Sequence, residues 1–210
     1  MQDVTENSKK SHGWLWLVLI GWIGTAAFML WFKWAGIHWF ALGDTDDNMR
    51  IQQVRDWIGG QGWYDLRQHR LDPPGGADIH WSRLVDLPLA GMILLFRPIF
   101  GDKTAQQIAV AVAPMLPLLI AYAASAATVR RLIAPGSWPI AFGVIMCSQS
   151  MLSMFMPLRI DHHGWQLAMD CVLMAGLVDP QARRGGLTVA AATVVSLVIG
   201  LEMLPYLAIA

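Results

Sequence analysis

The sequence predicts an all-α integral membrane protein, a multi-span helical bundle with a long first external loop that carries surface-lying helices. Of its 210 residues, 55% are hydrophobic and only 14% are charged, whereas soluble domains usually carry about 25% charged residues. The mean hydropathy is +0.44. This composition excludes disorder, a coiled coil and an ordinary soluble enzyme. The formal net charge is zero, so we expect no nucleic-acid partner, because phosphate backbones are bound by basic faces.

The first predicted span is residues 13–32, an uncharged run long enough to cross about 30 Å of hydrocarbon. It is longer than the apolar core of a signal peptide, and no convincing small-residue cleavage site follows it, so we expect an uncleaved anchor. Four later apolar stretches are also predicted to span the membrane: residues 108–127, 138–157, 165–178 and 187–210.

Residues 87–100 are apolar but short, contain Pro88 and Pro98, and include Arg97. Segments of that length more often lie in the interface than cross the bilayer, so we expect this one to lie along the outer surface. With five spans, the basic pairs at residues 9–10, 130–131 and 183–184 all fall on one side, which the positive-inside rule makes cytoplasmic. The sequence therefore predicts a multi-pass protein of the cell (inner) membrane, with a cytoplasmic N-terminus and a first external loop at residues 33–104.

The external loop is predicted to contain a short amphipathic helix over residues 48–58. Ile51, Val54 and Ile58 share one helix face, and Arg50 and Arg55 lie off it. A second surface helix is expected to begin near Ser82. Five tryptophans fit an aromatic belt at the level of the lipid headgroups: Trp34, Trp39, Trp57, Trp63 and Trp81.

Two polar clusters could carry chemistry. Asp44, Asp46 and Asp47 place three carboxylates within four residues, which favours a hard divalent cation. The alternative is a solvated acidic turn that caps the following helix. On either interpretation, this cluster lies just past the first predicted span and thus on the external face.

The second cluster is the short link from Arg159 to His163, predicted to emerge on the same face. Asp161 with one histidine supplies the mixed oxygen and nitrogen ligands that suit Mn²⁺, Zn²⁺ or Fe²⁺, although a polar surface link is the alternative. Neighbouring residues on a helix point about 100° apart, so we expect only one of His162 and His163 to face an ion. Asp161 and His163 can converge if the link is extended. Asp44, Asp161 and His163 are therefore the predicted metal ligands, with open positions for a substrate phosphate.

The segment from Asp44 to Arg50 resembles a signature in the first external loop of oligosaccharyltransferase catalytic subunits, Asp…Asn/His-x-Arg. Asp44 stands six residues before Arg50, and Asn48 matches the polar position between them. The sequence Asp161-His162-His163 resembles the second acidic motif of the archaeal members. These enzymes are C-type (GT-C) membrane glycosyltransferases with a long first external loop.

The resemblance implies transfer of a sugar or oligosaccharide from a polyprenyl-phosphate-linked donor to an acceptor protein or glycan on the external, periplasmic face. Asp44, Asp161 and His163 would hold Mn²⁺ or Mg²⁺, with Asp44 and Asp161 as the catalytic residues. Asp44 would also orient the acceptor, and Arg159 would neutralise a donor phosphate. Membrane lipid is the other expected partner, and Arg50 is expected to pair with a neighbouring carboxylate.

The chain departs from this family in lacking its acceptor-reading Trp-Trp-Asp motif and its later acidic external-loop residue. It also ends within an apolar stretch, so we expect one transmembrane domain that is the N-terminal part of a larger module or a shortened homologue. Asp170 and Glu202 fall within predicted spans, where a charge costs about 2.5–3.5 kcal/mol. Two interpretations of these acidic residues remain open: they are neutralised inside the bundle, or they form the ion path of a transporter. A non-catalytic scaffold is a further alternative.

Overall fold

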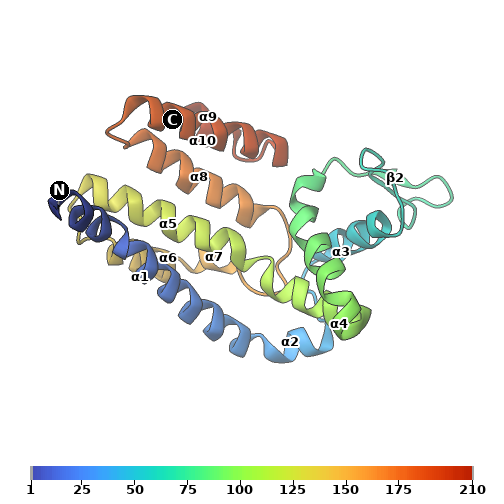
Figure 1. Cartoon of the computed structure of the whole chain (residues 1–210). Helices are drawn as coiled ribbons and strands as arrows, with labels where there is room; N and C mark the ends of the chain where they lie inside the picture. Colours follow the sequence, from blue (N-terminus) through green and yellow to red (C-terminus); the bar gives the residue numbers. More distant parts are fainter. Residues whose placement is uncertain (1, 210) are drawn as a thin grey trace.

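Helices form nearly all of the regular structure (Figure 1). The computed structural model describes the backbone of residues 2–209 and the side chains of residues 13–209. In chain order the elements are α1 (Gln2–Phe32), α2 (Trp34–Trp39), α3 (Thr45–Ile58), β1 (Arg67–Gln68), β2 (Ala77–Asp78), the 3₁₀ helix η1 (Arg83–Val85), α4 (Asp86–Val112), α5 (Met115–Leu132), α6 (Pro139–Cys147), α7 (Gln149–Ser153), α8 (His163–Leu177), α9 (Ala182–Ile199) and α10 (Leu204–Ile209). The two short strands pair antiparallel.

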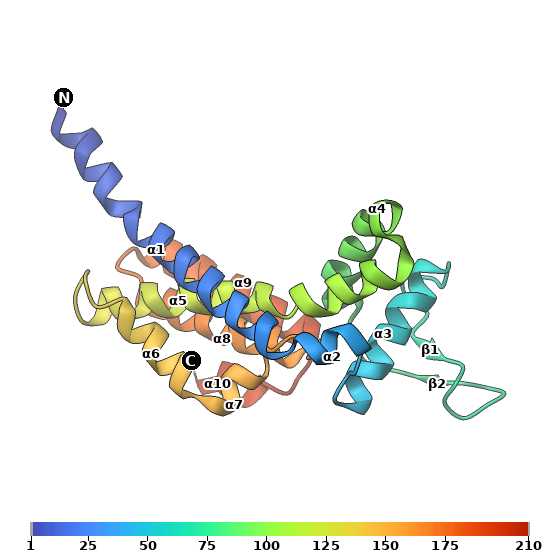
Figure 2. The same ribbon diagram turned by 90° about the horizontal axis from the view of Figure 1, so that it is seen from below.

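Most of the long helices form a bundle, and one group of elements covers one of its ends. Helices α1, α5, α8 and α9 lie side by side, with α6 and α7 beside α5 (Figures 1 and 2). Helices α2, α3 and α4 and the β-hairpin gather at the end of the bundle where α8 begins. Close packing of α8 on α9 requires glycine, because a Cβ at Gly185 would lie 2.6 Å from the carbonyl oxygen of Gly176.

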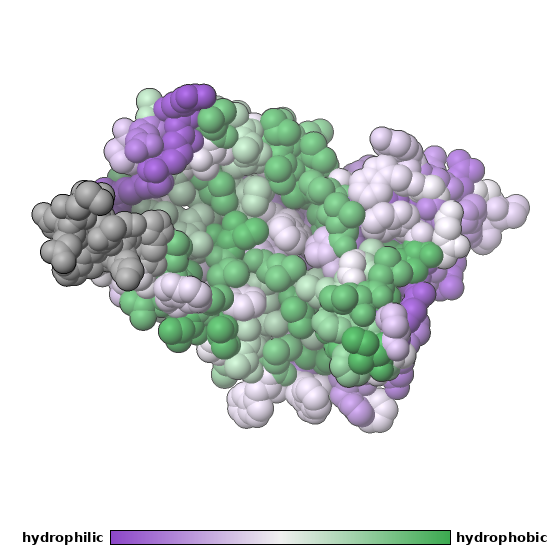
Figure 3. All heavy atoms as spheres, in the orientation of Figure 1, coloured by the Kyte–Doolittle hydropathy of each residue, from purple (hydrophilic) through white to green (hydrophobic). Residues whose placement is uncertain are grey.

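Three helical stretches of the described chain are long and apolar enough to cross a membrane: Gly13–Phe32, Arg83–Leu132 and Ala182–Ile199. Hydrophobic residues cover much of the bundle surface, while hydrophilic residues gather toward the hairpin end and at the opposite corner (Figure 3). Large apolar side chains such as Trp16, Trp31 and Val194 are more than half exposed, as expected for helices in contact with lipid. The structure is therefore that of a mostly helical protein with membrane-spanning character.

The helix bounds differ from the expected ranges wherever proline, glycine or an extended residue interrupts an apolar run. Residues 108–127 are divided between α4 and α5 at Pro114, which has no backbone N–H to donate. Residues 138–157 are divided between α6 and α7 at Ser148, which has φ −85° and ψ 86°. The expected continuous stretch at 187–210 ends at Ile199, because Gly200 is extended. Residues 87–100 lie in α4 outside the long-helix bundle, and Gly101, with φ 79°, then kinks this helix.

Two of the three basic pairs lie at the end of the bundle opposite the hairpin. The Arg130 guanidinium lies 4.9 Å from the ring of Trp14, near the start of the apolar part of α1. Arg131 and Arg184 both pair with Asp179, at 2.8 and 2.7 Å. These two pairs thus lie at the same end of the bundle. The side chains of the pair at residues 9–10 lie outside the described residues.

The external-loop predictions are partly confirmed. Helix α3 covers the predicted amphipathic segment and buries Ile51 and Val54, and Ser82 caps η1 through the N–H of Leu84. Arg50 pairs with the carboxylate of Asp86 at 3.0 Å, so the expected pairing is confirmed, and its side chain is completely buried. The belt position expected for Trp81 was wrong, because that residue is only 7% exposed and its ring lies under Arg50.

Candidate functional site

Asp44 is the N-cap of α3. Its Oδ1 accepts a hydrogen bond from the backbone N–H of Asp46 at 2.9 Å, so the capping interpretation of the acidic cluster is confirmed. Its other carboxylate oxygen forms an ion pair with Arg159. The bond from Asp46 and the Arg159 charge lower the pKa of Asp44 below its ordinary value. At neutral pH Asp44 is therefore a carboxylate that can accept further hydrogen bonds.

Asp47 joins the two predicted clusters. It is 1% exposed, and its Oδ1 accepts hydrogen bonds from the backbone N–H groups of Ile160 and Asp161 at 2.9 and 3.1 Å. Its Oδ2 lies 3.2 Å from Nη1 of Arg159. Burial raises the pKa of Asp47 to about 6, although Arg159 and the Ile160 bond act against this. One side chain thus fixes the link before α8 against the first turn of α3.

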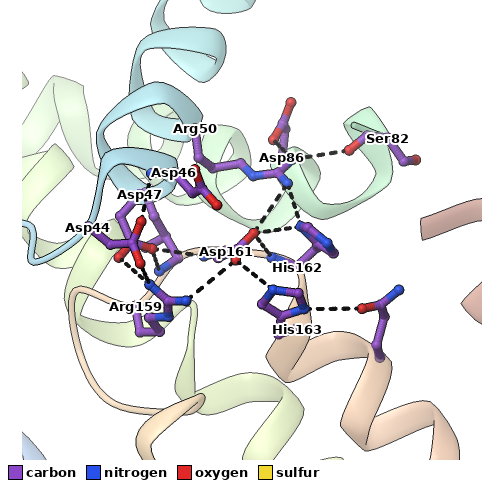
Figure 4. A network of polar contacts seen from close by, with 12 residues as sticks. Asp44, Asp46, Asp47, Arg50, Ser82, Asp86, Arg159, Asp161, His162 and His163 are labelled. Carbon is purple, nitrogen blue, oxygen red and sulfur yellow. Dashed lines mark hydrogen bonds and ion pairs between the residues drawn. The ribbon is translucent and has the colours of Figure 1, made fainter. Parts of the chain in front are cut away.

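Asp161, His162 and His163 form a compact group at the start of α8 (Figure 4). Each offers one ligand atom, and these atoms all lie within 4.8 Å of one another. Nδ1 of His162 lies 2.5 Å from Oδ1 of Asp161, and Nε2 of His163 lies 3.3 Å from Oδ2. Asp161 and His162 are buried, whereas the His163 side chain is 39% exposed. The group is therefore accessible from one side.

Arg159 and Arg50 flank this group on two sides. Nη2 of Arg159 lies 3.7 Å from Oδ2 of Asp161, so this one guanidinium contacts Asp44, Asp47 and Asp161. Nη2 of Arg50 lies 3.2 Å from Nδ1 of His162 and 3.8 Å from Oδ1 of Asp161. Burial raises the pKa of Asp161, but the hydrogen bonds and charge of His162, with the charge of His163, outweigh it and hold that pKa well below its usual range.

The residues present fit a divalent cation. Among the described residues, Oδ2 of Asp161 is buried and has no hydrogen-bond partner, and its charged neighbours His163 and Arg159 lie 3.3 and 3.7 Å away. Buried polar atoms are ordinarily hydrogen-bonded. One carboxylate with two imidazoles is a donor set suited to Mn²⁺, Zn²⁺ or Fe²⁺. Asp44, Asp47 and Asp161 surround the guanidinium of Arg159, and Arg50, which also contacts Asp161, is shared with the carboxylate of Asp86. The carboxylates thus outnumber the guanidinium groups, which leaves negative charge for a cation.

A groove of about 350 Å³ opens beside Asp44 and Arg159. One part of its wall is charged, and the other part is apolar and comes from the end of α1 and from the residues around α7. The lining residues include Phe32, Lys33, Asp44, Asp47, Met156, Pro157, Leu158 and Arg159. Such a mixed wall can accommodate a molecule with one polar and one apolar part.

Of the predicted site residues, Asp44, Asp161, His163 and Arg159 all lie in one polar network, as the sequence led us to expect. Asp44 reaches Asp161 through Arg159 and is not a member of the compact group of Asp161, His162 and His163, which could hold a metal ion. We expected only one of the two histidines to face an ion, but the ligand atoms of both lie within 4.8 Å of one another and of Asp161. His162 is the N-cap of α8 and not an interior helical residue, so both rings can turn toward the carboxylate.

Three participants were not predicted as site residues: His162, Asp47 and Glu202. Asp47 belongs to the same acidic motif as Asp44 and follows it by three residues, so this spacing could have identified Asp47 as a site residue. Glu202 was expected inside the last span, but it lies beyond the end of α9, and its Oε1 is 3.1 Å from Nε2 of His162. Asp170 lies within α8, where its Oδ1 is buried and has no hydrogen-bond partner in the described part of the chain.

No family model matches the chain, and no curated protein or solved structure gives a significant match.

Proposed function

We propose that this chain is a membrane glycosyltransferase of the oligosaccharyltransferase-like, C-type class. It would transfer a sugar from a polyprenyl-phosphate-linked donor to an acceptor on the external face, with the help of a divalent metal ion. The observation that carries the proposal is the meeting of two acidic motifs, more than a hundred residues apart in the chain, on one guanidinium beside a metal-ligating group. The polar end of an apolar bundle is a suitable place for a substrate with a lipid tail.

Asp161, His162 and His163 would hold the metal ion. When bound, such an ion would act as a Lewis acid and make the donor phosphate a better leaving group. Asp44 remains the fourth residue that we predict to contribute to the metal site, and in the structure its carboxylate pairs with Arg159. Mn²⁺ suits this donor set better than Mg²⁺, which prefers oxygen ligands alone.

In the proposed reaction, the bond between the anomeric carbon and the donor phosphate oxygen breaks, and the acceptor oxygen or nitrogen bonds to that carbon. The phosphate leaves with the electron pair, and the acceptor proton passes to water. Asp44 would orient the acceptor by accepting its hydrogen bond, because its lowered pKa makes it a weak base. Arg159 would donate to the phosphate, and the apolar wall of the neighbouring groove would hold the start of the lipid tail.

The test measures transfer from a polyprenyl-diphosphate-linked sugar to asparagine peptides and to hydroxyl acceptors by the purified full chain in lipid nanodiscs. We expect Asp161→Ala and Asp44→Ala to lower the rate by about 100-fold or more, since loss of a metal ligand or an acceptor-orienting group removes several kcal/mol of transition-state stabilisation.

Asp46→Asn is the matched control. Asp46 lies in the same acidic motif, but its side-chain carboxylate is contacted only by Thr45, at 3.4 Å, among the described hydrogen bonds and ion pairs. We expect this variant to keep its activity. Unchanged transfer by both alanine variants, in protein that remains folded, would refute the proposal.

The transporter alternative requires Asp170 and Glu202 on one ion path. Glu202 hydrogen-bonds His162 and Gln166 beyond the end of α9, so these contacts favour a role in the metal-ligating group. Solute or ion flux that falls in Asp170→Asn, with sugar transfer unaffected by Asp161→Ala, would favour the transporter.

A further inference from the structure

Two side chains stand behind the histidines of the metal-ligating group. Gln166 follows His163 by three residues in α8, and its Oε1 lies 3.4 Å from Nδ1 of that histidine. Its Nε2 donates to Oε2 of Glu202 at 2.6 Å. The other Glu202 oxygen, Oε1, lies 3.1 Å from Nε2 of His162. Gln166 is completely buried, so the surrounding residues restrict the orientation of its amide group.

The hydrogen-bond partners of the two histidines indicate which nitrogen of each ring donates a hydrogen away from Asp161. Arg50 can only donate, and its Nη2 lies 3.2 Å from Nδ1 of His162, while an ionised Glu202 can only accept. Nε2 of His162 therefore carries a hydrogen that Glu202 accepts, while Nδ1 faces Arg50 and also lies 2.5 Å from Oδ1 of Asp161. The Gln166 nitrogen is used by Glu202, so its oxygen accepts from Nδ1–H of His163. Nδ1 of His162 and Nε2 of His163 are then the ring nitrogens beside Asp161, at 2.5 and 3.3 Å from its two oxygens, and a cation bound there would replace any hydrogen that they share with it.

We infer that Glu202 and Gln166 are positioning residues that fix both histidines as ligands of a divalent cation, and that His162 is the third ligand beside Asp161 and His163. This inference rests on the proposed metal site and adds to it the residues that prepare the site. Metal-bound histidines ordinarily donate their second N–H to a carboxylate or carbonyl oxygen, and mutation of such partners typically costs 10–100-fold in metal affinity.

The close contacts of Gly200 support the pairing of Glu202 with Gln166. A Cβ at this position would lie 2.1 Å from Oε2 of Glu202 and 3.0 Å from Nε2 of Gln166. A side chain at residue 200 would therefore displace the end of the Glu202 side chain from its present position. We expect Gly200→Ala to displace Glu202 and to lower metal affinity in the same direction as loss of Glu202.

The test is direct Mn²⁺ binding to the full chain in detergent, measured by calorimetry and by the electron paramagnetic resonance signal of free Mn²⁺. It compares Glu202→Gln, Gln166→Glu and the double variant that exchanges the two residues. Glu202→Gln cannot accept from both His162 and Gln166, and Gln166→Glu sets two carboxylates against each other. The exchange restores every hydrogen bond with the same net charge.

We expect each single variant to bind Mn²⁺ about 10–100-fold more weakly than the original chain, and the exchange variant to recover to within about threefold. Asp102→Asn is the matched control, because Asp102 accepts from Gln106 at 2.5 Å in a similar carboxylate–amide pair outside the candidate site. Circular dichroism and thermal unfolding verify that each variant folds.

Mn²⁺ affinity that is unchanged in both single variants would overturn the inference, as would an exchange variant no better than the singles. An original chain that binds no Mn²⁺ would overturn it too. The proposed function fails separately: the expected binding pattern without sugar transfer to any acceptor would uphold the positioning role and refute the glycosyltransferase.

Discussion

Arg50 is a charged residue that the structure buries completely, and its neighbours explain how this is possible. Nη1 of Arg50 lies 3.0 Å from Oδ1 of Asp86, which is also fully buried, and it donates to the carbonyl oxygen of Ser82. The guanidinium carbon lies 4.7 Å from the ring centre of Trp81. A buried charge is tolerated when it is paired and hydrogen-bonded, and an aromatic face adds a favourable contact. Arg50 therefore ties α3 to the start of α4 beside the site.

Replacement of Arg50 by leucine should destabilise the protein by about 3–5 kcal/mol, because it leaves the Asp86 carboxylate buried with only Arg83 nearby. The double variant Arg50→Leu/Asp86→Leu should be less destabilised than this single variant, since it removes the unpaired charge as well. Thermal and denaturant unfolding in detergent measure both effects. A double variant as unstable as the sum of its two single changes would contradict this account of the pair.

At the scale of elements, the turn between α8 and α9 is organised by one carboxylate. Asp179 accepts two hydrogen bonds from Arg184 and one from the backbone N–H of Gln181, and it pairs with Arg131 from α5. The Arg184 bonds, with the others, lower the pKa of Asp179 to about 2. Three helices are thus joined at the end of the bundle away from the candidate site.

This arrangement predicts a pH-dependent contribution to stability. The folded-state pKa of Asp179 lies below the ordinary value of 3.8, so the folded state favours the ionised carboxylate. Its stabilising effect should be complete above about pH 4 and should disappear as the pH falls toward 2. We expect Asp179→Asn to lower the melting temperature at pH 7, with the difference from the original chain narrowing between pH 4 and pH 2. A difference independent of pH would show that the ionised carboxylate is not responsible.

At the scale of the whole molecule, local patterns predicted the elements better than the contacts between them. The apolar spacing of Ile51 and Val54 and the capping aspartate were enough to predict α3. The helix ends near Pro114 and Gly200 fall inside stretches predicted as continuous spans, because hydropathy alone does not show where a backbone break falls within an apolar run. The positive-inside rule placed Asp44 and Asp161 on one face, and in the structure both contact Arg159.

The burial of Arg50 and the contacts of Glu202 could not be predicted in the same way. Arg50 lies off the apolar face of α3, and only the approach of α4 with Asp86 makes its burial possible. Glu202 lies about forty residues from His162 in the chain, and its position depends on where α9 ends. Both are tertiary effects for which a single sequence carries no periodic signal.

The last prediction concerns how the molecule lies in the membrane. Tyr64, between α3 and β1, is 94% exposed at the hairpin end, and Gly136, between α5 and α6, is exposed near the Arg130 end. In a background in which Cys147 and Cys171 are replaced by serine, Tyr64→Cys should react with a membrane-impermeant maleimide in spheroplasts. Gly136→Cys should react only after the membrane is permeabilised, because the end that carries Arg130, Arg131 and Arg184 should face the cytoplasm. Reaction of both cysteines without permeabilisation would contradict a bundle that spans the membrane. The reverse pattern would keep the spans but place Asp161 and its neighbours on the cytoplasmic side, where an external acceptor could not reach them.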